Sequence, residues 1–501
     1  MKRQVFIAAS FLVFGAVGLP LLPGKAAAAP AGQFSVADFG ARADGVTTNT
    51  LFIQNTIDAA AAAGGGVVTF NQGTYLSGAI FLKSNVRLQL PDGAILCAIQ
   101  DNQLYPERPN RIAGIEMNWP TALVNVYQQT NVAIMGKGTI DGNGAYWWRM
   151  FWGDDGAGGM LKDYKARGLR WAVDYDCKRV RAVEVYDSKD VSIRGVTIKR
   201  PGFWSLAVIY SERVTVDGVN VLANVGGYGP STDGIDIDSS RDILVQNCTV
   251  DCNDDDICLK AGRDADGLRV NRPTENVIIR NCTTWAGGGM ITIGSETSGG
   301  IRNVEVSHIK AYGTSNGIRF KSAKTRGGIV ENIRIHDITM ENVENPLQFE
   351  LNWYPAYSNT SLPPDTDTNQ VPSYWLVLTQ KVEPPGRGLP EFRNIVISNV
   401  TATAANQAIY VNGFADKPIH NVQFDKVKIE AQKPGTISHA ADWTFTDVVF
   451  ATPTGRNVRL VDVKNVEPPP VAKAGVTVAT PAASTAPKPF SLGMGTTDSA
   501  E

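Results

Sequence analysis

The chain has 501 residues, of which 43% are hydrophobic and 19% charged, so a large packed core is expected and disorder of most of the chain is excluded. The 47 basic and 49 acidic side chains nearly cancel, which gives no support to a nucleic-acid partner. Four histidines in the whole chain weaken any function built on a histidine triad or on imidazole metal ligands.

The N-terminus has the features of an export signal. A basic start at Lys2 and Arg3 precedes an apolar run over residues 5–22, and small residues follow up to Pro30. This pattern predicts a signal peptide over residues 1–28 and a secreted or periplasmic protein. An uncleaved anchor is the alternative. No later stretch approaches the ~20 apolar residues of a membrane span, so no membrane association is expected after cleavage.

Residues 50–63 carry apolar side chains at helical spacing and follow Thr47, Thr48 and Asn49, any of which could cap a helix. Three glycines at 64–66 end the pattern. We therefore predict one amphipathic helix near the start of the mature chain. Its role follows from the repeats that come after it.

A short motif recurs through the chain: Asn, Asp or Arg, followed by alternating apolar residues rich in Val and Ile. Its copies recur about every 28 residues between 190 and 332 and begin at residues 131, 190, 213, 242, 276, 303, 332, 394 and 421. The alternation predicts short strands, and so small a unit must stack on its neighbours to bury its apolar face. Leucine-rich repeats and propeller blades fit the pattern less well. We predict an all-β fold, a single right-handed parallel β-helix (a solenoid) over residues 34–465, with helix 50–63 covering its first coil.

The end of the chain differs in composition. Three prolines at 468–470 open a segment rich in Ala, Thr, Ser and Pro that runs to Glu501. It has few apolar side chains to bury, so residues 468–501 are predicted to be a disordered tail.

Four consecutive repeats contain a second strand whose outward residues are charged or unusually small, over residues 233–238, 254–260, 289–296 and 317–321. Aligning their apolar pairs places Asp233 and Asp255 at equivalent positions on rungs about 4.8 Å apart, with Asp256 beside Asp255. Arg319 and Lys321 emerge from the same face further along, because they are two residues apart on one strand.

This arrangement suggests acid/base chemistry on an anionic sugar. Carboxylates held close together cannot all ionise at their usual pKa, so one keeps a proton. A protonated acid beside an ionised one is what glycosidic hydrolysis requires, and Arg319 and Lys321 offer a cationic site for a sugar carboxylate. Single Asp residues are also common in turns. Clustered carboxylates can bind calcium, but the two cations would oppose it, so no metal or other cofactor is predicted.

These residues resemble the motif series of glycoside hydrolase family 28, the polygalacturonase family of pectin hydrolases. The matching segments are residues 231–236, Asp255-Asp256 with Gly262, residues 294–296 with Gly299-Gly300, and residues 319–321. The segment 38–45 and the glycines at 64–66 also resemble the N-terminal cap of pectin-acting β-helices. The resemblance spans roughly residues 34–460.

The resemblance implies inverting hydrolysis beside galacturonic acid. By position, Asp255 is similar to the general acid, and Asp233 and Asp256 to the pair that activates water. Arg319 and Lys321 are similar to the substrate-binding cations, and we place Asp236 with them. Two departures leave the choice between homogalacturonan and rhamnogalacturonan open: Ser231 replaces an Asn, and the glycines 287–289 stand where the family has Gly-His-Gly.

The sequence thus predicts an exported, monomeric pectin hydrolase that cleaves α-linked galacturonic acid bonds in a polysaccharide without a cofactor. A hydrolase of rhamnogalacturonan or another substituted pectin, a calcium-dependent pectate lyase of the same architecture, and a non-catalytic polysaccharide-binding β-helix are the alternatives. Trp147, Trp148 and Trp152 lie in an insertion between repeats, as does Trp353. We expect these side chains to be buried under the loops. If such loops close one end of the cleft, the enzyme would attack chain ends.

Overall fold

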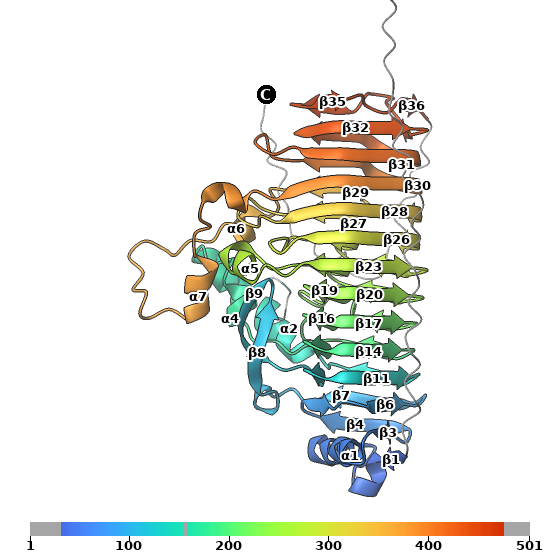
Figure 1. The fold of residues 1–501 in the computed structure, drawn as a ribbon, viewed down its shortest axis with the longest axis vertical. Helices are drawn as coiled ribbons and strands as arrows, with labels where there is room; N and C mark the ends of the chain where they lie inside the picture. The colour runs from blue at the N-terminus through green and yellow to red at the C-terminus, as the bar shows by residue number, and fades with distance from the viewer. Residues whose placement is uncertain (1–31, 155, 157, 475–501) are drawn as a thin grey trace, which may run out of the picture.

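The computed structural model describes residues 32–474, except 155 and 157. The predicted signal peptide, residues 1–28, lies outside the described residues. The strands stack into one long solenoid with α1 at one end and the last strands at the other (Figure 1). The predicted right-handed parallel β-helix is confirmed.

The solenoid has three faces, and each strand pairs in parallel with its counterpart one coil further on. The first face, which carries the charged segments, consists of β5 (Ile80–Leu82), β10 (Val124–Tyr127), β13 (Val183–Tyr186), β16 (Leu206–Ile209), β19 (Ile235–Asp238), β22 (Asp255–Lys260), β25 (Gly289–Ile293), β27 (Asn316–Lys321) and β29 (Asn345–Glu350).

The second face consists of β1 (Gln33–Ser35), β3 (Gly66–Thr69), β6 (Val86–Leu90), β11 (Thr130–Gly136), β14 (Lys189–Arg194), β17 (Glu212–Asp217), β20 (Arg241–Gln246), β23 (Thr274–Arg280), β26 (Ile301–Tyr312), β28 (Ile329–Glu341), β30 (Glu391–Asn412), β31 (Ile419–Ser438), β32 (Ala440–Thr446) and β35 (Lys464–Val466). The third face begins with β2 (Asp44–Thr48), β4 (Gly73–Ser77), β7 (Ala94–Ala98), β12 (Thr139–Asp141), β15 (Thr197–Lys199), β18 (Asn220–Leu222), β21 (Thr249–Cys252) and β24 (Thr283–Ala286). The long strands β26, β28, β30 and β31 bend from one face to the next, and β33 (Val449–Thr452), β34 (Arg459–Val461) and β36 (Val471–Lys473) pair at the end.

The first residue of every repeat motif adopts a left-handed backbone conformation, with φ between 54° and 58° from Asn131 to Asn421. Asn and Asp tolerate this conformation better than other non-glycine residues, which explains why they lead most copies. Neighbouring copies also bond to each other: the Asn303 amide donates to Asn276 Oδ1 at 3.2 Å. The motif therefore marks one corner of each coil.

The core is the interior of the solenoid. The apolar pairs aligned from the sequence pair in register, as Ile235 with Ile257, Ile257 with Ile291, and Ile291 with Ile318. All four side chains are fully buried. This register fixes which outward residues lie next to one another on the first face.

The predicted capping helix is confirmed as α1 (Thr50–Ala62), which lies at the N-terminal end of the solenoid (Figure 1). Asn49 holds the N-cap position but makes no side-chain capping bond. Its amide instead accepts from the Arg42 backbone N–H at 2.7 Å and donates to Thr47 O at 2.7 Å, so it fixes the loop before the helix.

The insertions project from one side of the solenoid (Figure 1). They contain the antiparallel hairpin β8 (Glu107–Ile112) and β9 (Ile115–Pro120), the helices α2 (Ala145–Trp152), α3 (Gly159–Ala166), α4 (Val173–Asp176), α5 (Asp264–Val270), α6 (Pro355–Ser358) and α7 (Ser373–Leu378), and the short 3₁₀ helices η2 (Asn102–Leu104) and η3 (Pro385–Gly388). A further 3₁₀ helix, η1 (Val36–Phe39), contacts α1 at the N-terminal end of the solenoid. Trp147, Trp148 and Trp152 are buried, as expected, whereas Trp353 is half-buried.

The C-terminal boundary needs a correction. β36 (Val471–Lys473) pairs with β33, so the solenoid extends beyond residue 465 and into the segment predicted to be a disordered tail. The valine and alanine after the three prolines suffice for one edge strand. Residues 475–501 lie outside the described residues.

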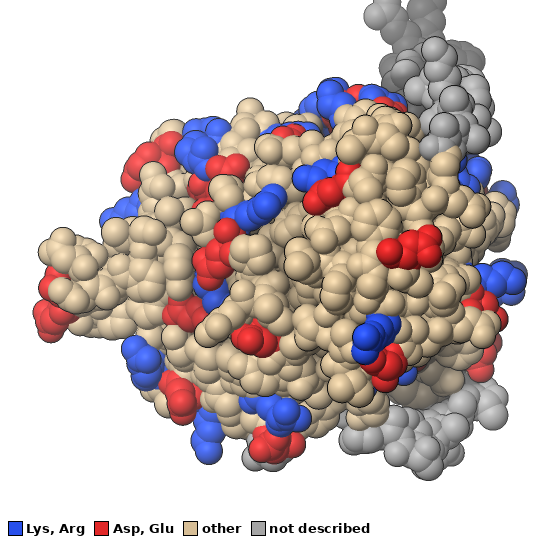
Figure 2. All heavy atoms as spheres, turned by 90° about the horizontal axis from the view of Figure 1, so that it is seen from below, with Lys and Arg blue, Asp and Glu red and all other residues tan. Residues whose placement is uncertain are grey.

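No helix in residues 32–474, as far as the structure describes them, is long and apolar enough to cross a membrane. On the end of the molecule drawn in Figure 2, acidic and basic side chains are interspersed, in keeping with the near-zero net charge.

Candidate active site

The first face brings together the acidic and basic segments singled out in the sequence. The Gly234 backbone N–H donates to Asp255 O at 2.9 Å, so Asp233 and Asp255 occupy equivalent positions on adjacent coils. An oxygen of the Asp233 carboxylate lies within 4.8 Å of one from Asp255. The structure thus places two acids, distant by 22 positions in the chain, in one small site.

Asp255 is the centre of this site. Its carboxylate accepts hydrogen bonds from Thr292 Oγ1 at 2.7 Å, Arg319 Nη1 at 3.2 Å and Lys321 Nζ at 2.6 Å. Burial alone would raise its pKa, but the charges of Lys321, Arg319 and Lys260 hold it well below the usual value. Asp255 is therefore ionised, and Arg319 and Lys321 are the cations that keep it so.

Asp254, the preceding residue, is partly exposed, whereas Asp255 is buried. Burial and then the negative charge of Asp255 raise the pKa of Asp254, against the opposing pull of Lys321 and the other cations. Its Oδ1 accepts the Asp255 backbone N–H at 2.9 Å. Asp254 can therefore carry a proton at the edge of the site. From this run of three acids we predicted Asp255 and Asp256, and not Asp254, as site residues.

Asp256 points away from the cations. It is 0% exposed, and its carboxylate accepts from Cys252 Sγ, a thiol of the solenoid core, at 3.2 Å. Burial raises its pKa well above the usual value. The tight turn before β22 breaks the period-2 alternation, so Asp255 faces outward and Asp256 inward, and the structure does not bring Asp256 to the site.

A buried cation, Lys260, was also missed. Its ammonium lies 3.3 Å from Asp233 and from Asp236 and 3.8 Å from Glu296, and it faces the Trp204 ring at 5.0 Å. Strand alternation could have identified it, because Lys260 is an outward residue of a segment already selected. A lysine surrounded by three carboxylates neutralises charge that the site could not otherwise hold.

The acids around Lys260 differ in the direction in which their pKa values are shifted. Burial and then the charges of Asp236 and Asp254 raise the pKa of Asp233 well above its usual value. Burial also raises the pKa of Asp236 to about 7, although Lys260 opposes the shift. Glu296 differs: burial would raise its pKa, but Lys260, Arg326 and other cations lower it. Asp233 and Asp236 therefore retain a proton between them more readily than Glu296 or Asp255.

The glycines 287–289, which lack the family's histidine, lie beside these acids. A Cβ on Gly289 would lie 2.4 Å from Thr292 Oγ1 and 3.2 Å from Asp255 Oδ1. Arg319 Nη1 also donates to Gly288 O at 3.3 Å. The absence of side chains here therefore leaves room for the bonds that hold Asp255.

The hairpin formed by residues 107–120, here called the closing hairpin, covers one end of the site. Its tip lies between two insertions: Ala113 O accepts from Tyr175 OH and Gly114 O from the Arg263 N–H, each at 2.9 Å. A Cβ on Gly114 would lie 2.7 Å from Glu296 Cγ. Since Glu296 belongs to the acidic cluster, the hairpin closes the cleft on the side of the earlier coils.

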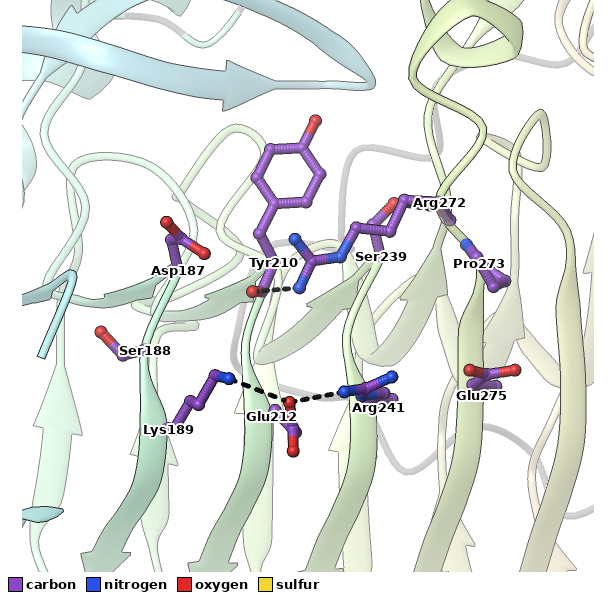
Figure 3. Close-up of a pocket in the computed structure, with 10 residues that line it drawn as sticks. All are labelled: Asp187, Ser188, Lys189, Tyr210, Glu212, Ser239, Arg241, Arg272, Pro273 and Glu275. Carbon is purple, nitrogen blue, oxygen red and sulfur yellow. Dashed lines mark hydrogen bonds and ion pairs between the residues drawn. The ribbon is translucent and has the colours of Figure 1, made fainter. Parts of the chain in front are cut away.

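A different hollow, of about 330 Å³, lies outside the closing hairpin and is shown in Figure 3. Three of its charged side chains pair with one another, since Glu212 lies 3.6 Å from Lys189 and 2.7 Å from Arg241. Arg272 reaches over it and donates to Tyr210 O (Figure 3). The reactive acids are not among its lining residues, so we place the active site on the first face instead.

A family model described as Glycosyl hydrolases family 28 matches residues 110–373, which include all the site residues discussed above. The chain belongs to this family. It is therefore a glycoside hydrolase. A second model, described as Rhamnogalacturonase A/epimerase, pectate lyase-like, matches residues 33–93, the region of the N-terminal cap.

Among curated relatives, a probable polygalacturonase of Vitis vinifera is 30% identical over 75% of this chain and 75% of its own length. An exo-poly-alpha-D-galacturonosidase of Dickeya chrysanthemi is 27% identical over 83% of this chain and 70% of its own. The solved exopolygalacturonase of Thermotoga maritima superposes with a TM-score of 0.69 at 27% identity, covering 80% of this chain and 88% of that one.

Proposed function

We propose that this protein hydrolyses α-linked galacturonic acid bonds in pectin by acid/base catalysis. The observation that carries the proposal is an ionised Asp255, held by Arg319 and Lys321 and within 4.8 Å of Asp233, beside the partly exposed Asp254. Similarity to polygalacturonases of plants and bacteria supports the substrate class.

In this mechanism Asp254 gives its proton to the glycosidic oxygen as the bond from the sugar's anomeric carbon breaks. A water held by Asp233 and Asp255 attacks that carbon, and Asp255 takes the water's proton. The raised pKa of Asp254 suits an acid, and the depressed pKa of Asp255 keeps that carboxylate ionised, as it must be to accept the water's proton. Attack from the face opposite the leaving group would invert the anomeric centre.

These roles differ from those that the resemblance implied. Asp255 was expected to be the acid, but a carboxyl that two cations hold ionised gives up its proton too early for that task. Asp256 was expected to activate water, but it is enclosed by core atoms. The pair Asp254-Asp255 therefore replaces the pair Asp255-Asp256.

The substrate carboxylate would bind Arg319 and Lys321, with the Trp353 ring beside it. Lys321 Nζ lies 4.4 Å from the centre of that ring, so an aromatic face and two cations line one subsite. Asp236 acts indirectly in this proposal, because it pairs with Lys260 rather than lining the open part of the site.

The closing hairpin favours cleavage from a chain end. With Gly114 packed against Glu296, a polysaccharide cannot continue past the site on the side of the earlier coils. The enzyme would then release short products one at a time. Export to the cell exterior or periplasm and a monomeric state complete the proposal.

Product analysis tests this proposal. Incubation with polygalacturonate should give saturated monogalacturonate or digalacturonate from the earliest times, with inversion at the new reducing end seen by NMR. Rhamnogalacturonan in a parallel reaction tests the alternative substrate. A chelator-sensitive reaction with an ultraviolet-absorbing unsaturated product would instead identify a pectate lyase and refute the proposal. Binding without turnover would identify a non-catalytic protein.

A further inference from the structure

A partly exposed strip of side chains runs along the third face, next to the site. It consists of Leu222, Asp251, Trp285 and Tyr312, which lie in register on four successive coils; we call it the aromatic strip. Trp285 is 45% exposed, although tryptophan is on average a highly buried residue. Its ring stacks on Tyr312, with centroids 4.5 Å apart and planes at 21°.

The strip lies close to the reacting groups. Trp285 and Gly288 are three residues apart, a span of at most about 10 Å, and Gly288 contacts both Arg319 and Asp254 through its backbone. Asp251 lies equally close along the chain to Asp254. The strip is therefore continuous with the site's edge.

The walls of the cleft leave this flank open. The closing hairpin lies over the earlier coils, and α5–α7 belong to the insertions that follow β22 and β29 on the opposite flank. Between the third face and the first, the connections that follow Asp251, Trp285 and Tyr312 are short turns, residues 253–254, 287–288 and 313–315, whereas the one that follows Leu222 is a longer loop over residues 223–234. A polysaccharide that enters the site by its end must extend away from the closing hairpin. The short turns leave a path for it from the first face to the third.

The chemistry of the strip suits a sugar ring. One face of Trp285 is covered by Tyr312, and its neighbour on the other side is the shorter Asp251, which leaves the indole face uncovered above it. The apolar face of a pyranose stacks on such a surface. Asp251 is half-buried, and its Oδ1 has no hydrogen-bond partner among the described residues. Burial also raises the Asp251 pKa, which lessens its repulsion of a uronate.

We propose that Trp285 and Tyr312 form a binding platform for sugar rings of the substrate chain that lie outside the cleft, beyond the residue bound by Arg319 and Lys321. The proposal rests on the proposed function, since the occupant is that same polysaccharide. It makes Trp285 a determinant of affinity for long chains and gives it no part in bond cleavage.

The test compares Trp285→Ala and Trp285→Phe with wild type on polygalacturonate and on digalacturonate. Trp285→Ala should raise KM for the polymer by about 3- to 10-fold, the range of one lost aromatic contact, and leave kcat for both substrates and KM for the dimer unchanged. Trp285→Phe should recover most of the polymer affinity. Leu51→Ala on α1, another exposed apolar residue but at the far end of the solenoid, should behave as wild type.

An unchanged polymer KM in Trp285→Ala would overturn the proposal while leaving the hydrolase intact. A wild-type protein inactive on galacturonan would refute the proposed function. In that case the aromatic strip can still be tested by affinity electrophoresis in gels that contain polygalacturonate. Asp255→Asn is compared with the double variant Asp255→Asn/Trp285→Ala, and equal retardation of the two would contradict the proposed platform. If wild type elutes as a dimer in gel filtration and Trp285→Ala elutes as a monomer, the aromatic strip binds a second copy of the chain, and the proposal is also overturned.

Discussion

Replacing Lys321 by methionine should move the acid limb of the pH–rate profile. Lys321 Nζ lies 2.6 Å from Asp255 Oδ2 and is one of two cations that bond this carboxylate. Loss of an opposite charge at this distance typically raises a carboxyl pKa by about 1–3 units. Because Asp255 must be ionised to accept a proton from water, activity below the new pKa is lost.

The assay is kcat/KM on digalacturonate from pH 7 down to the lowest pH at which both proteins stay folded, because the pKa of Asp255 lies well below its usual value in wild type. The shape of the profile separates ionisation from weaker binding. Weaker binding lowers the whole curve, whereas the loss of Lys321 should also shift its acid limb upward by at least about 1 unit. Lys324→Met, an exposed lysine three positions away, is the matched control. An acid limb that stays in place in Lys321→Met would refute the assignment of Asp255 as the base.

Other predictions concern packing and stability. Gly289→Ala should lower kcat by tenfold or more, since its Cβ would lie 2.4 Å from Thr292 Oγ1 and 3.2 Å from Asp255 Oδ1, whereas Gly386→Ala, with open space around it, should be neutral. Equal rates for the two variants would argue against a crowded site. The pKa of buried Asp264 is lowered to about 2, because the charges of Arg326 and Arg263 outweigh the effect of burial. A depressed carboxyl pKa stabilises the fold above the unfolded-state pKa, and that contribution is lost as pH falls through the folded one. Unfolding free energy should therefore drop by about 2 kcal/mol from this group between pH 4 and pH 2. Urea titrations at several pH values can follow the drop, and Asp264→Asn should be less stable and lack it; the same drop in the variant would contradict this account.

The sequence predicted the architecture because its signals are local and repeated. Each coil has a corner in a left-handed backbone conformation, which favours Asn or Asp, and a buried pair of side chains, which favours Val or Ile. The same residue types therefore recur in every coil, and the copies can be aligned from the sequence alone. The register of Ile235 with Ile257 then placed Asp233 beside Asp255. The final strand, β36, was missed because an edge strand of three residues carries almost no pattern.

The details of the site could not be predicted in the same way. Alternation holds inside a strand, but the turn before β22 reverses it, so the facing of Asp254, Asp255 and Asp256 depends on a backbone path that the alternation does not reveal. The closing hairpin depends on contacts with Tyr175 and Arg263, which are distant in the chain. Lys260, in contrast, could have been predicted from strand alternation, which places its side chain on the outward face.

In the proposed mechanism Asp254 and Asp255, and not Asp256, carry the reaction. Rates of reducing-sugar release from polygalacturonate by Asp254→Asn, Asp255→Asn and Asp256→Asn, with thermal unfolding to verify the fold of each, test it directly. We predict losses of at least a hundredfold for the first two, since acid/base catalysis is worth about 10²–10⁴, and a rate within tenfold of wild type for a folded Asp256→Asn. A folded Asp256→Asn that is as inactive as Asp255→Asn, beside an active Asp254→Asn, would contradict the account.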